Sequence, residues 1–330
     1  MPSDDRAAPH PTEGLVGKVV VTGAAGMLGT AVIDRLADRH EVVATDLAAG
    51  YRRKGVRWSL FDLCDRDVLE RFLLAERPDL VVHTAALVDV DRCEQDPSAA
   101  ERLHVDTTDV ISRALAGWDA SLIYISTDSV FDGRKDGPYD EGDPPAPPNT
   151  YARTKLLGEA ACLTLERATV LRTNIFGWSR AERMSFAEWV LRGLVERSTL
   201  SMFSDVLYTP IHVTQLAETI ESVWRQGVHG LYHAAGLTCL SKYEFAILVA
   251  SVFRLPTDNV TARSVDAAGL AANRPKNMAL SSARLSSALG RAAPSVIDGI
   301  QLMKRQYDDG WVARVKGRAV APGYRFWEVA

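Results

Sequence analysis

Cysteine is scarce in this chain, and its few thiols are far apart. The four cysteines stand at positions 64, 93, 162 and 239 without a Cys-x-x-Cys pair, and the seven histidines show no ligand spacing either. A disulfide framework or a structural zinc site needs cysteines at short, paired intervals. We therefore expect reduced, mostly buried thiols and no metal centre.

Two further absences narrow the class of protein. With 38 basic against 42 acidic residues, the formal net charge of -4 leaves no basic excess to attract nucleic acid or an anionic membrane. Apolar runs stay short of the roughly 18 residues of a membrane span. The polar leader 1–14, which we expect to be disordered, lacks the apolar core of a signal peptide. These features predict a cytoplasmic protein that binds neither nucleic acid nor membrane.

A glycine-rich turn follows the first apolar run. Lys18–Thr22 has a strand pattern, glycines follow at three-residue spacing, and residues 30–37 have a helical pattern. In a dinucleotide-binding turn the first glycine permits the bend, the second lets the backbone approach a pyrophosphate, and the third lets the helix pack closely on the strand. The cofactor contacts expected here are Gly23, Gly26, Met27, Leu28 and Gly29.

An acidic residue at the end of the second strand bears on the choice of cofactor. Asp46 comes 17 residues after Gly29, where a ribose-binding carboxylate is expected. A carboxylate repels a 2′-phosphate, so Asp46 favours NAD(H). The basic residues Arg52, Arg53 and Lys54 follow and could accept that phosphate if the loop folds back, which leaves NADP(H) open.

Strands and helices alternate along the first half of the chain. After the second strand, strand patterns occur at 56–61, 79–86, 121–127 and 168–174. Helical patterns between them occur at 65–76, 96–118 and 151–166. This alternation predicts the α/β class, with a doubly wound parallel sheet of the Rossmann type whose strands end at the ligand site. Further cofactor contacts are expected at that edge from Asp62, Leu63, Ala85 and Ala86.

The alternation weakens beyond residue 177, which indicates a second, smaller lobe. We expect residues 15–177 to form the dinucleotide-binding domain, with 209–235 returning to it through a helix and a strand. Residues 178–208 and 236–330 are then expected to form a substrate-binding lobe. Its helical patterns lie near 185–197, 241–253 and 294–307.

A tyrosine and a lysine stand four residues apart at the start of a helical pattern. This spacing puts Tyr151 and Lys155 on one helix face, and Thr127 precedes them at a strand end. A phenol with a pKa of about 10 is a poor acid at neutral pH, but a nearby ammonium favours the phenolate and lowers that pKa. The three residues predict a proton-transfer unit.

Together, these motifs resemble the extended short-chain dehydrogenases/reductases and, among them, the dTDP-4-dehydrorhamnose reductase family. The resemblance covers roughly residues 17 to 305. Beyond the glycine loop and the proton-transfer unit, it rests on the segments Ala85–Glu94, Ser126–Gly133, Tyr139–Glu141, Pro147–Tyr151, Lys155–Glu159, Leu171–Asn174, Asp205, Thr209–Pro210 and Arg274–Pro275.

The resemblance implies a reaction and a set of substrate contacts. A reduced nicotinamide would deliver hydride to the 4-keto carbon of a nucleotide-linked 6-deoxy sugar while Tyr151 protonates the forming alkoxide. Thr127 would polarise the carbonyl. Tyr151 and Lys155 would contact the cofactor, with Lys155 binding the nicotinamide ribose. A homodimer is one assembly that the sequence leaves open. The implied substrate contacts are Val88, Asp128, Ser129, Asn174 and, for the diphosphate, Arg274.

Three positions depart from the pattern of that family. His104 stands where Asn usually helps to hold the lysine through water, Ser129 where Tyr usually lies beside the nicotinamide and the sugar, and Ala152 where Gly commonly follows the tyrosine. Ser129 also disfavours a 4,6-dehydratase, in which the related motif is typically Thr-Asp-Glu. Two alternatives stay open: a nucleotide-sugar 4-epimerase with bound NAD, and a non-catalytic regulatory subunit resembling that of methionine adenosyltransferase.

Overall fold

Seven strands form one sheet, and its central strands are continuous apolar runs because helices cover both faces. The computed structural model describes residues 17–180, 184–268 and 275–317. Neighbouring strands all pair in parallel, in the order β11-β6-β5-β4-β1-β2-β3. The predicted doubly wound α/β class is confirmed. The strands are β1 (Lys18–Thr22), β2 (Glu41–Asp46), β3 (Val56–Leu60), β4 (Leu80–His83), β5 (Ser121–Thr127), β6 (Ala168–Thr173) and β11 (Gly230–His233).

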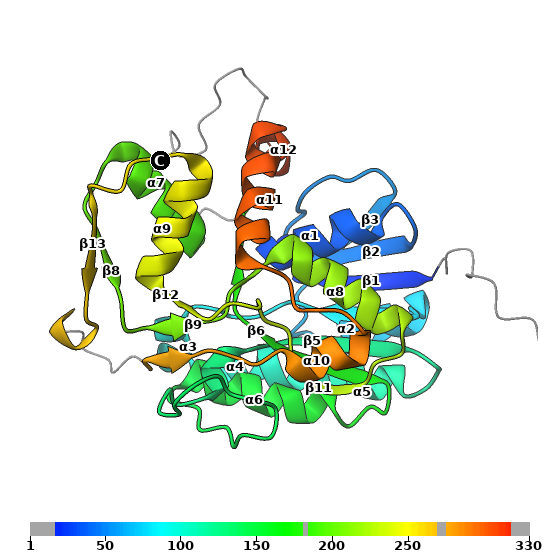
Figure 1. Cartoon of the computed structure of the whole chain (residues 1–330). Coiled ribbons are helices and arrows are strands. Elements are labelled where there is room, and N and C mark those ends of the chain that lie inside the picture. The colour runs from blue at the N-terminus through cyan, green and yellow to red at the C-terminus, as the bar shows by residue number, and fades with distance from the viewer. Residues whose placement is uncertain (1–16, 181–183, 269–274, 318–330) are drawn as a thin grey trace, which may run out of the picture.

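Side chains of β1 alternate between two cores, one on each face of the sheet. Val19 and Val21 pack under α1 and α8, whereas Val20 packs under α2 and α5 on the other face. Figure 1 shows α1 and α8 side by side on one face and α5 and α6 on the other. These helices are α1 (Met27–Leu36), α2 (Arg66–Glu76), α5 (Thr107–Leu115), α6 (Thr150–Cys162) and α8 (Val213–Arg225).

The helix predicted for residues 96–118 is present from Pro97 to Leu115, but it contains a π-helical turn. In the π-helical turn η1, the Thr107 N–H bonds to the Arg102 carbonyl five residues back. The hydroxyls of Thr107 and Thr108 donate to the carbonyls of Leu103 and His104, so side chains satisfy groups that the irregular turn would leave unpaired. Along the chain, the elements are α3 (Val90–Gln95), α4 (Pro97–Glu101), η1 (Arg102–Asp106) and α5.

A second lobe lies beside the large sheet and has a core of its own (Figure 1). Its helices α7 and α9 each start at a serine in a capping box with a glutamate three residues later, the pattern that starts a helix. Its elements are α7 (Phe186–Glu196), β8 (Leu200–Phe203), β9 (Leu207–Tyr208), β12 (Leu240–Ser241), α9 (Lys242–Phe253), β13 (Val260–Arg263), η3 (Asp266–Ala268), β14 (Asn277–Met278), α11 (Val296–Asp308) and α12 (Trp311–Val315).

Short elements connect the two lobes. Between β9 and β12 the chain returns to the large lobe, where α8 packs on α1 and β11 extends the sheet beside β6. The connecting elements are η2 (Asp128–Val130), β7 (Ile175–Phe176), β10 (Ile211–His212) and α10 (Ala283–Leu289).

Within the described ranges no helix is both long and apolar enough to cross a bilayer. In the same ranges no group of three or more His, Cys, Asp or Glu side chains is placed to hold a metal ion.

The loop that follows β5 is anchored to the second lobe. Gly133 has a φ of +76°, and a Cβ there would lie 2.4 Å from the Pro275 Cβ. The Asn277 amide donates to the carbonyls of Lys135 and Gly137 at 2.7 and 2.6 Å. These contacts place the carboxyl end of β5 between the lobes.

A buried ion pair holds α6 against β6 and yields a first prediction. Arg172 donates to both carboxylate oxygens of Glu159 at 2.9 and 2.7 Å, and the two side chains are only 3 % and 4 % exposed. Arg172→Met leaves that carboxylate buried without its partner, so the free energy of unfolding should fall by about 3–5 kcal/mol. Arg167→Met removes an exposed pair with Asp119 and should cost about 1 kcal/mol or less. Urea denaturation measures both; equal losses would show that the buried pair does not secure α6.

Candidate active site

The glycine loop leaves room for a ligand at one position and none at the other two. Gly23 has a φ of +63°, and a Cβ there would lie 2.6 Å from the Ala85 Cα. A Cβ on Gly29 would lie 2.3 Å from the Gly23 carbonyl oxygen, so α1 packs tightly on the turn. At Gly26 the nearest atom is that oxygen at 3.1 Å, and this residue starts α1 without a side-chain cap. The first-turn amides of α1 are thus presented as a pyrophosphate cradle requires.

Asp46 is held against this loop. Its carboxylate accepts from the Ala25 N–H at 3.0 Å and from the Leu47 N–H at 2.7 Å. Arg53, one of the basic residues considered for a 2′-phosphate, is instead paired at 2.6 Å with Asp38, which follows α1. Arg52 and Lys54 are exposed. The carboxylate, not the basic turn, therefore lies next to the glycine loop.

The other residues predicted to contact the cofactor differ in how exposed their side chains are. The Leu28 and Leu63 side chains are 4 % and 5 % exposed and belong to the cores, so a ligand could meet only their backbone. Ala85 is 9 % exposed and lies against Gly23, as a backbone close to a cofactor requires. Met27 and Ala86 are half-buried, and Asp62 is exposed, with its carboxylate accepting from the Cys64 N–H at 2.9 Å.

The first turn of α6 positions Tyr151. The Asn149 side chain accepts from the Ala152 N–H at 2.9 Å and so caps the helix. From α3, the Glu94 carboxylate accepts from the N–H and the hydroxyl of Thr150 at 2.6 and 2.9 Å, and these bonds lower the pKa of Glu94. Sequence reasoning included Glu94 in a family segment but did not recognise this role.

Thr127 and Tyr151 come together at the carboxyl edge of the sheet. Thr127 ends β5, and its hydroxyl lies close enough to the Tyr151 phenol to affect the pKa of that group. The pKa of Tyr151 is raised to about 12, chiefly by burial and further by the charge of Asp128, while Thr127 opposes the rise. The lowered pKa expected for Tyr151 is therefore wrong for this structure, because burial outweighs the influences that favour the phenolate.

Lys155 points into the large lobe. Its side chain is 2 % exposed, and its Nζ donates to the Ile125 carbonyl at 2.7 Å and lies 4.0 Å from the centre of the Tyr124 ring. Burial lowers the pKa of Lys155 to about 7, against the opposing charge of Glu159. In this structure the lysine thus bonds to strand β5, although it shares a helix with Tyr151 as predicted.

Three of the predicted substrate residues meet around one carboxyl group. Asp128 is 3 % exposed and accepts from the Asn174 amide at 2.5 Å, from the Thr127 hydroxyl at 3.2 Å and from the Ser129 hydroxyl at 3.3 Å. Burial raises the pKa of Asp128, while the bond from Asn174 opposes this rise. Val88 lies apart in the loop after β4, 67 % exposed. The predicted diphosphate contact, Arg274, lies outside the described residues.

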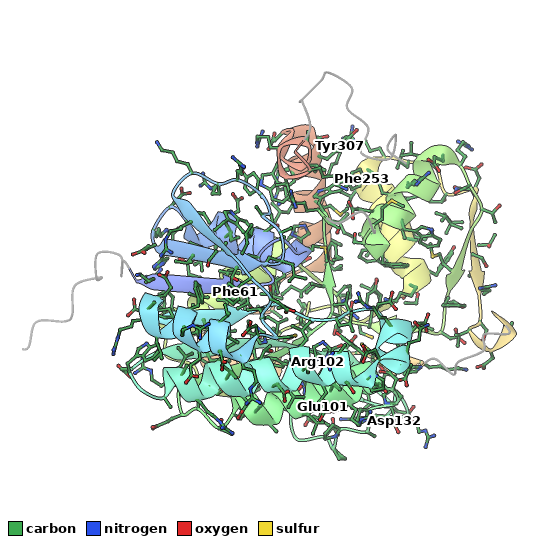
Figure 2. The ribbon with its side chains drawn as sticks, turned by 180° about the vertical axis from the view of Figure 1, so that it is seen from behind. Phe61, Glu101, Arg102, Asp132, Phe253 and Tyr307 are labelled. Atoms are coloured by element: carbon green, nitrogen blue, oxygen red, sulfur yellow. The ribbon has the colours of Figure 1, made fainter. Side chains whose placement is uncertain are left out.

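His104 occupies the π-helical turn and uses both ring nitrogens. The Leu87 N–H donates to Nε2 at 2.9 Å, and Nδ1 lies 2.8 Å from the Thr154 hydroxyl oxygen. Because that hydroxyl donates to the Thr150 carbonyl at 2.9 Å, Nδ1 carries the proton. Burial lowers the pKa of His104 to about 2, so the ring stays neutral. Glu101 and Arg102, labelled in Figure 2, are exposed on the helices just before it.

The second lobe contributes residues that sequence reasoning missed. Lys242, the first residue of α9, has its Nζ 3.2 Å from the centre of the Tyr208 ring and 4.8 Å from that of Phe186. Its charge also lowers the pKa of Asp128. No motif or spacing links position 242 to position 128, and only the capping box at Ser241 could have indicated where the helix starts.

The inward position of Lys155 predicts a pH-dependent stability. Its pKa is about 7 in the folded protein and 10.5 in the reference state, so between these values the unfolded chain binds more protons and the free energy of unfolding rises with pH. Lys155→Met removes this contribution. From pH 7 to pH 9, wild type should gain stability relative to the variant by up to about 1.4 kcal/mol per pH unit. Parallel profiles in urea denaturation would contradict the buried position.

Comparisons with known proteins agree with this geometry. The model of the family described as "RmlD substrate binding domain" matches residues 17–308. A probable low-salt glycan biosynthesis reductase of Haloferax volcanii is 27 % identical over 88 % of this chain and 98 % of its own length. Methionine adenosyltransferase 2 subunit beta of Pongo abelii is 33 % identical over 84 % of each chain.

Among solved structures, that of the dTDP-4-dehydrorhamnose reductase of Bacillus anthracis in complex with NADP is similar to this chain. Its TM-score is 0.78 at 26 % identity, and the match covers 88 % of this chain and all of that one. The family match spans both lobes and contains the glycine loop, Thr127, Tyr151 and Lys155. The chain belongs to the RmlD, or dTDP-4-dehydrorhamnose reductase, family.

Proposed function

We propose that this chain is an NAD(P)H-dependent reductase of a nucleotide-linked 4-keto-6-deoxy sugar. The observation that carries the proposal is the proximity of the Thr127 hydroxyl to the Tyr151 phenol. The two groups lie at the carboxyl edge of a parallel sheet, the edge from which the glycine loop also emerges. The reductases among its relatives support the same activity.

In this proposal Thr127 and Tyr151 neutralise the negative charge that forms on the substrate oxygen. A bound reduced nicotinamide supplies the hydride to the carbonyl carbon. The Thr127 hydroxyl donates to the carbonyl oxygen, and Tyr151 gives its proton to the alkoxide that forms there. With its pKa raised to about 12, the phenol keeps its proton at neutral pH until a stronger base, the alkoxide, takes it. The raised pKa therefore suits the direction of reduction.

The substrate class rests on the relatives and on the polar cluster around Asp128. We propose that Asp128, Ser129 and Asn174 bind sugar hydroxyl groups, that Val88 contacts the substrate from the loop after β4, and that Arg274 binds the diphosphate. Residues 15–177 with 209–235 would bind the cofactor, and 178–208 with 236–330 the substrate. A 4-epimerase would use the same groups with NAD retained, and product analysis separates the two.

Cofactor preference should follow Asp46. Its carboxylate lies against the glycine loop, whereas Arg53 is engaged by Asp38, so we propose a modest preference for NADH with NADPH also usable. The relative from Bacillus anthracis was crystallised with NADP, so the assay should include NADPH as well as NADH.

The glycine loop allows a test of cofactor binding that needs no substrate. Gly26→Val puts a branched side chain into the space proposed for the pyrophosphate, so dinucleotide affinity should fall about tenfold or more, from an overpacking cost of about 1–3 kcal/mol. Gly117→Val, at the opposite edge of the sheet, should leave the affinity unchanged. Calorimetric titration with NADH and NADPH measures both. Equal affinity of the Gly26 variant and wild type would mean that the cofactor binds elsewhere.

Tyr151→Phe tests the proposed activity. The change keeps the ring and removes the proton, so turnover should fall by about a hundredfold or more while stability and dinucleotide affinity survive. Tyr243→Phe, a half-buried tyrosine of α9, is the matched control. The assay follows NADH or NADPH absorbance and product stereochemistry with a panel of nucleotide 4-keto-6-deoxy sugars. Wild-type protein that binds the dinucleotide yet reduces none of them would exclude this function.

The 33 % sequence identity to methionine adenosyltransferase 2 subunit beta favours a second candidate function, that of a dinucleotide-binding regulatory subunit. Such a role needs the glycine loop but not a phenol paired with Thr127. Gel filtration with a methionine adenosyltransferase catalytic subunit, with and without dinucleotide, would detect the complex. A stable complex that survives Tyr151→Phe, together with no reduction in the sugar panel, would favour this candidate.

A further inference from the structure

The start of α6 is hydrogen-bonded to α3, a helix that comes from a different part of the chain. The Glu94 carboxylate of α3 accepts from the Thr150 N–H at 2.6 Å and from the Thr150 hydroxyl at 2.9 Å. Thr150 is the first residue of α6, is only 4 % exposed and directly precedes Tyr151. Glu94 therefore fixes the backbone one residue away from the phenol.

These two bonds are not what starts the helix. Asn149 accepts from the Ala152 N–H at 2.9 Å, which is the usual side-chain cap of a helix. Glu94 satisfies a further N–H of the first turn, one that has no partner within the helix itself. Because α6 has its own cap, the bonds to Glu94 specify where the helix begins relative to α3 rather than whether it forms.

The helix α3 is in turn attached to the loop that follows β4. The Cys93 thiol is buried and donates to the Leu87 carbonyl at 3.3 Å. At the start of the same loop, the Thr84 hydroxyl lies 3.2 Å from the Gly23 carbonyl oxygen. The loop thus joins the glycine turn, proposed to cradle the pyrophosphate, to the helix that carries Glu94.

A second connection runs from this loop to α6, one helical turn further along. The Leu87 N–H donates to His104 Nε2 at 2.9 Å, and His104 Nδ1 lies 2.8 Å from the Thr154 hydroxyl oxygen. The loop is therefore connected to α6 on both sides of Tyr151 in the sequence, through Glu94 at the first residue of the helix and through His104 one turn later. Two attachments fix the direction of a helix as well as its position.

We propose that Glu94 is a positioning residue that sets the place of the Tyr151 phenol relative to the cofactor, by holding the first residue of α6 against α3. This inference rests on the proposed reductase function. Glu94 acts through Thr150 and makes no contact with substrate or cofactor in this proposal. Proton transfer needs heavy atoms within about 2.6–3.2 Å of each other. A misplacement of about 1 Å caused by a distant change can cost about a hundredfold in rate. The effect should therefore be on kcat and not on binding.

The first test compares kcat with KM in the reductase assay. Glu94→Ala removes both bonds, so kcat should fall about tenfold, while KM for the dinucleotide and for the sugar nucleotide stays within about twofold of wild type. In Glu94→Gln the amide oxygen can accept from the N–H and the amide nitrogen can donate to the hydroxyl, so most of kcat should return.

The matched control is Glu101→Ala, which removes an exposed glutamate at the end of α4, labelled in Figure 2. Its kcat should equal that of wild type. A wild-type kcat in Glu94→Ala, a loss of equal size in Glu101→Ala, or no recovery in Glu94→Gln would overturn the proposal.

The second test needs no turnover. In protein labelled with ¹³C at the tyrosine Cζ, Tyr151→Phe assigns the signal of the Tyr151 phenol. Glu94→Ala should shift or broaden this signal, Glu94→Gln should restore it, and Glu101→Ala should leave it unchanged. Urea denaturation checks that each variant is folded. If wild type reduces no sugar nucleotide, the proposed function fails; an unchanged Tyr151 signal in Glu94→Ala refutes the positioning role whether or not turnover is found.

Discussion

The buried carboxylate of Glu159 is the constraint on which the rest of the site depends. It accepts hydrogen bonds from Arg172 on β6 and Ser126 on β5, and it lies one helical turn from Lys155. These contacts fix α6 against two neighbouring strands, so the start of the helix, with Tyr151, is held over the strand ends. A charge buried so deeply is tolerated only with its partners in place. The groups that hold the helix therefore decide where Tyr151 lies.

The irregular turn around His104 contacts α6 and is hydrogen-bonded to it through Thr154. A π-helical turn inserts one extra residue into a helical repeat, which turns a side chain inward that a regular helix would place elsewhere. The His104 ring then connects the backbone at Leu87, in the loop after β4, to Thr154 on α6. An imidazole that stays neutral and doubly bonded serves this connection well, since it has no charge to desolvate. The histidine at this position thus connects the loop after β4 to α6.

Local patterns were enough to predict the sheet, the glycine loop and the meeting of Thr127 with Tyr151, because strand ends of a parallel sheet share an edge. They could not predict where Lys155 points. A four-residue spacing defines the helix face, but a long side chain on that face can reach outward or along the strand beneath. Its direction and the pKa of Tyr151 depend on burial, which β5 and α6 create only when packed together. The π-helical turn at residues 102–106 was missed because no residue spacing distinguishes it from a regular helical turn, and the threonine hydroxyls around it bond only to carbonyls four residues back.

No sequence motif pointed to Lys242 in the second lobe, yet this residue acts on the central carboxyl group of the site. Lys242 lies over Tyr208, and its charge lowers the pKa of Asp128, which burial raises. The charge effect depends on the two lobes lying together, because Asp128 follows a strand of one lobe and Lys242 starts a helix of the other. Separation of the lobes would remove it. The proton affinity of Asp128 is therefore a property of the assembled pair of lobes, and motifs from the large lobe alone could not define it.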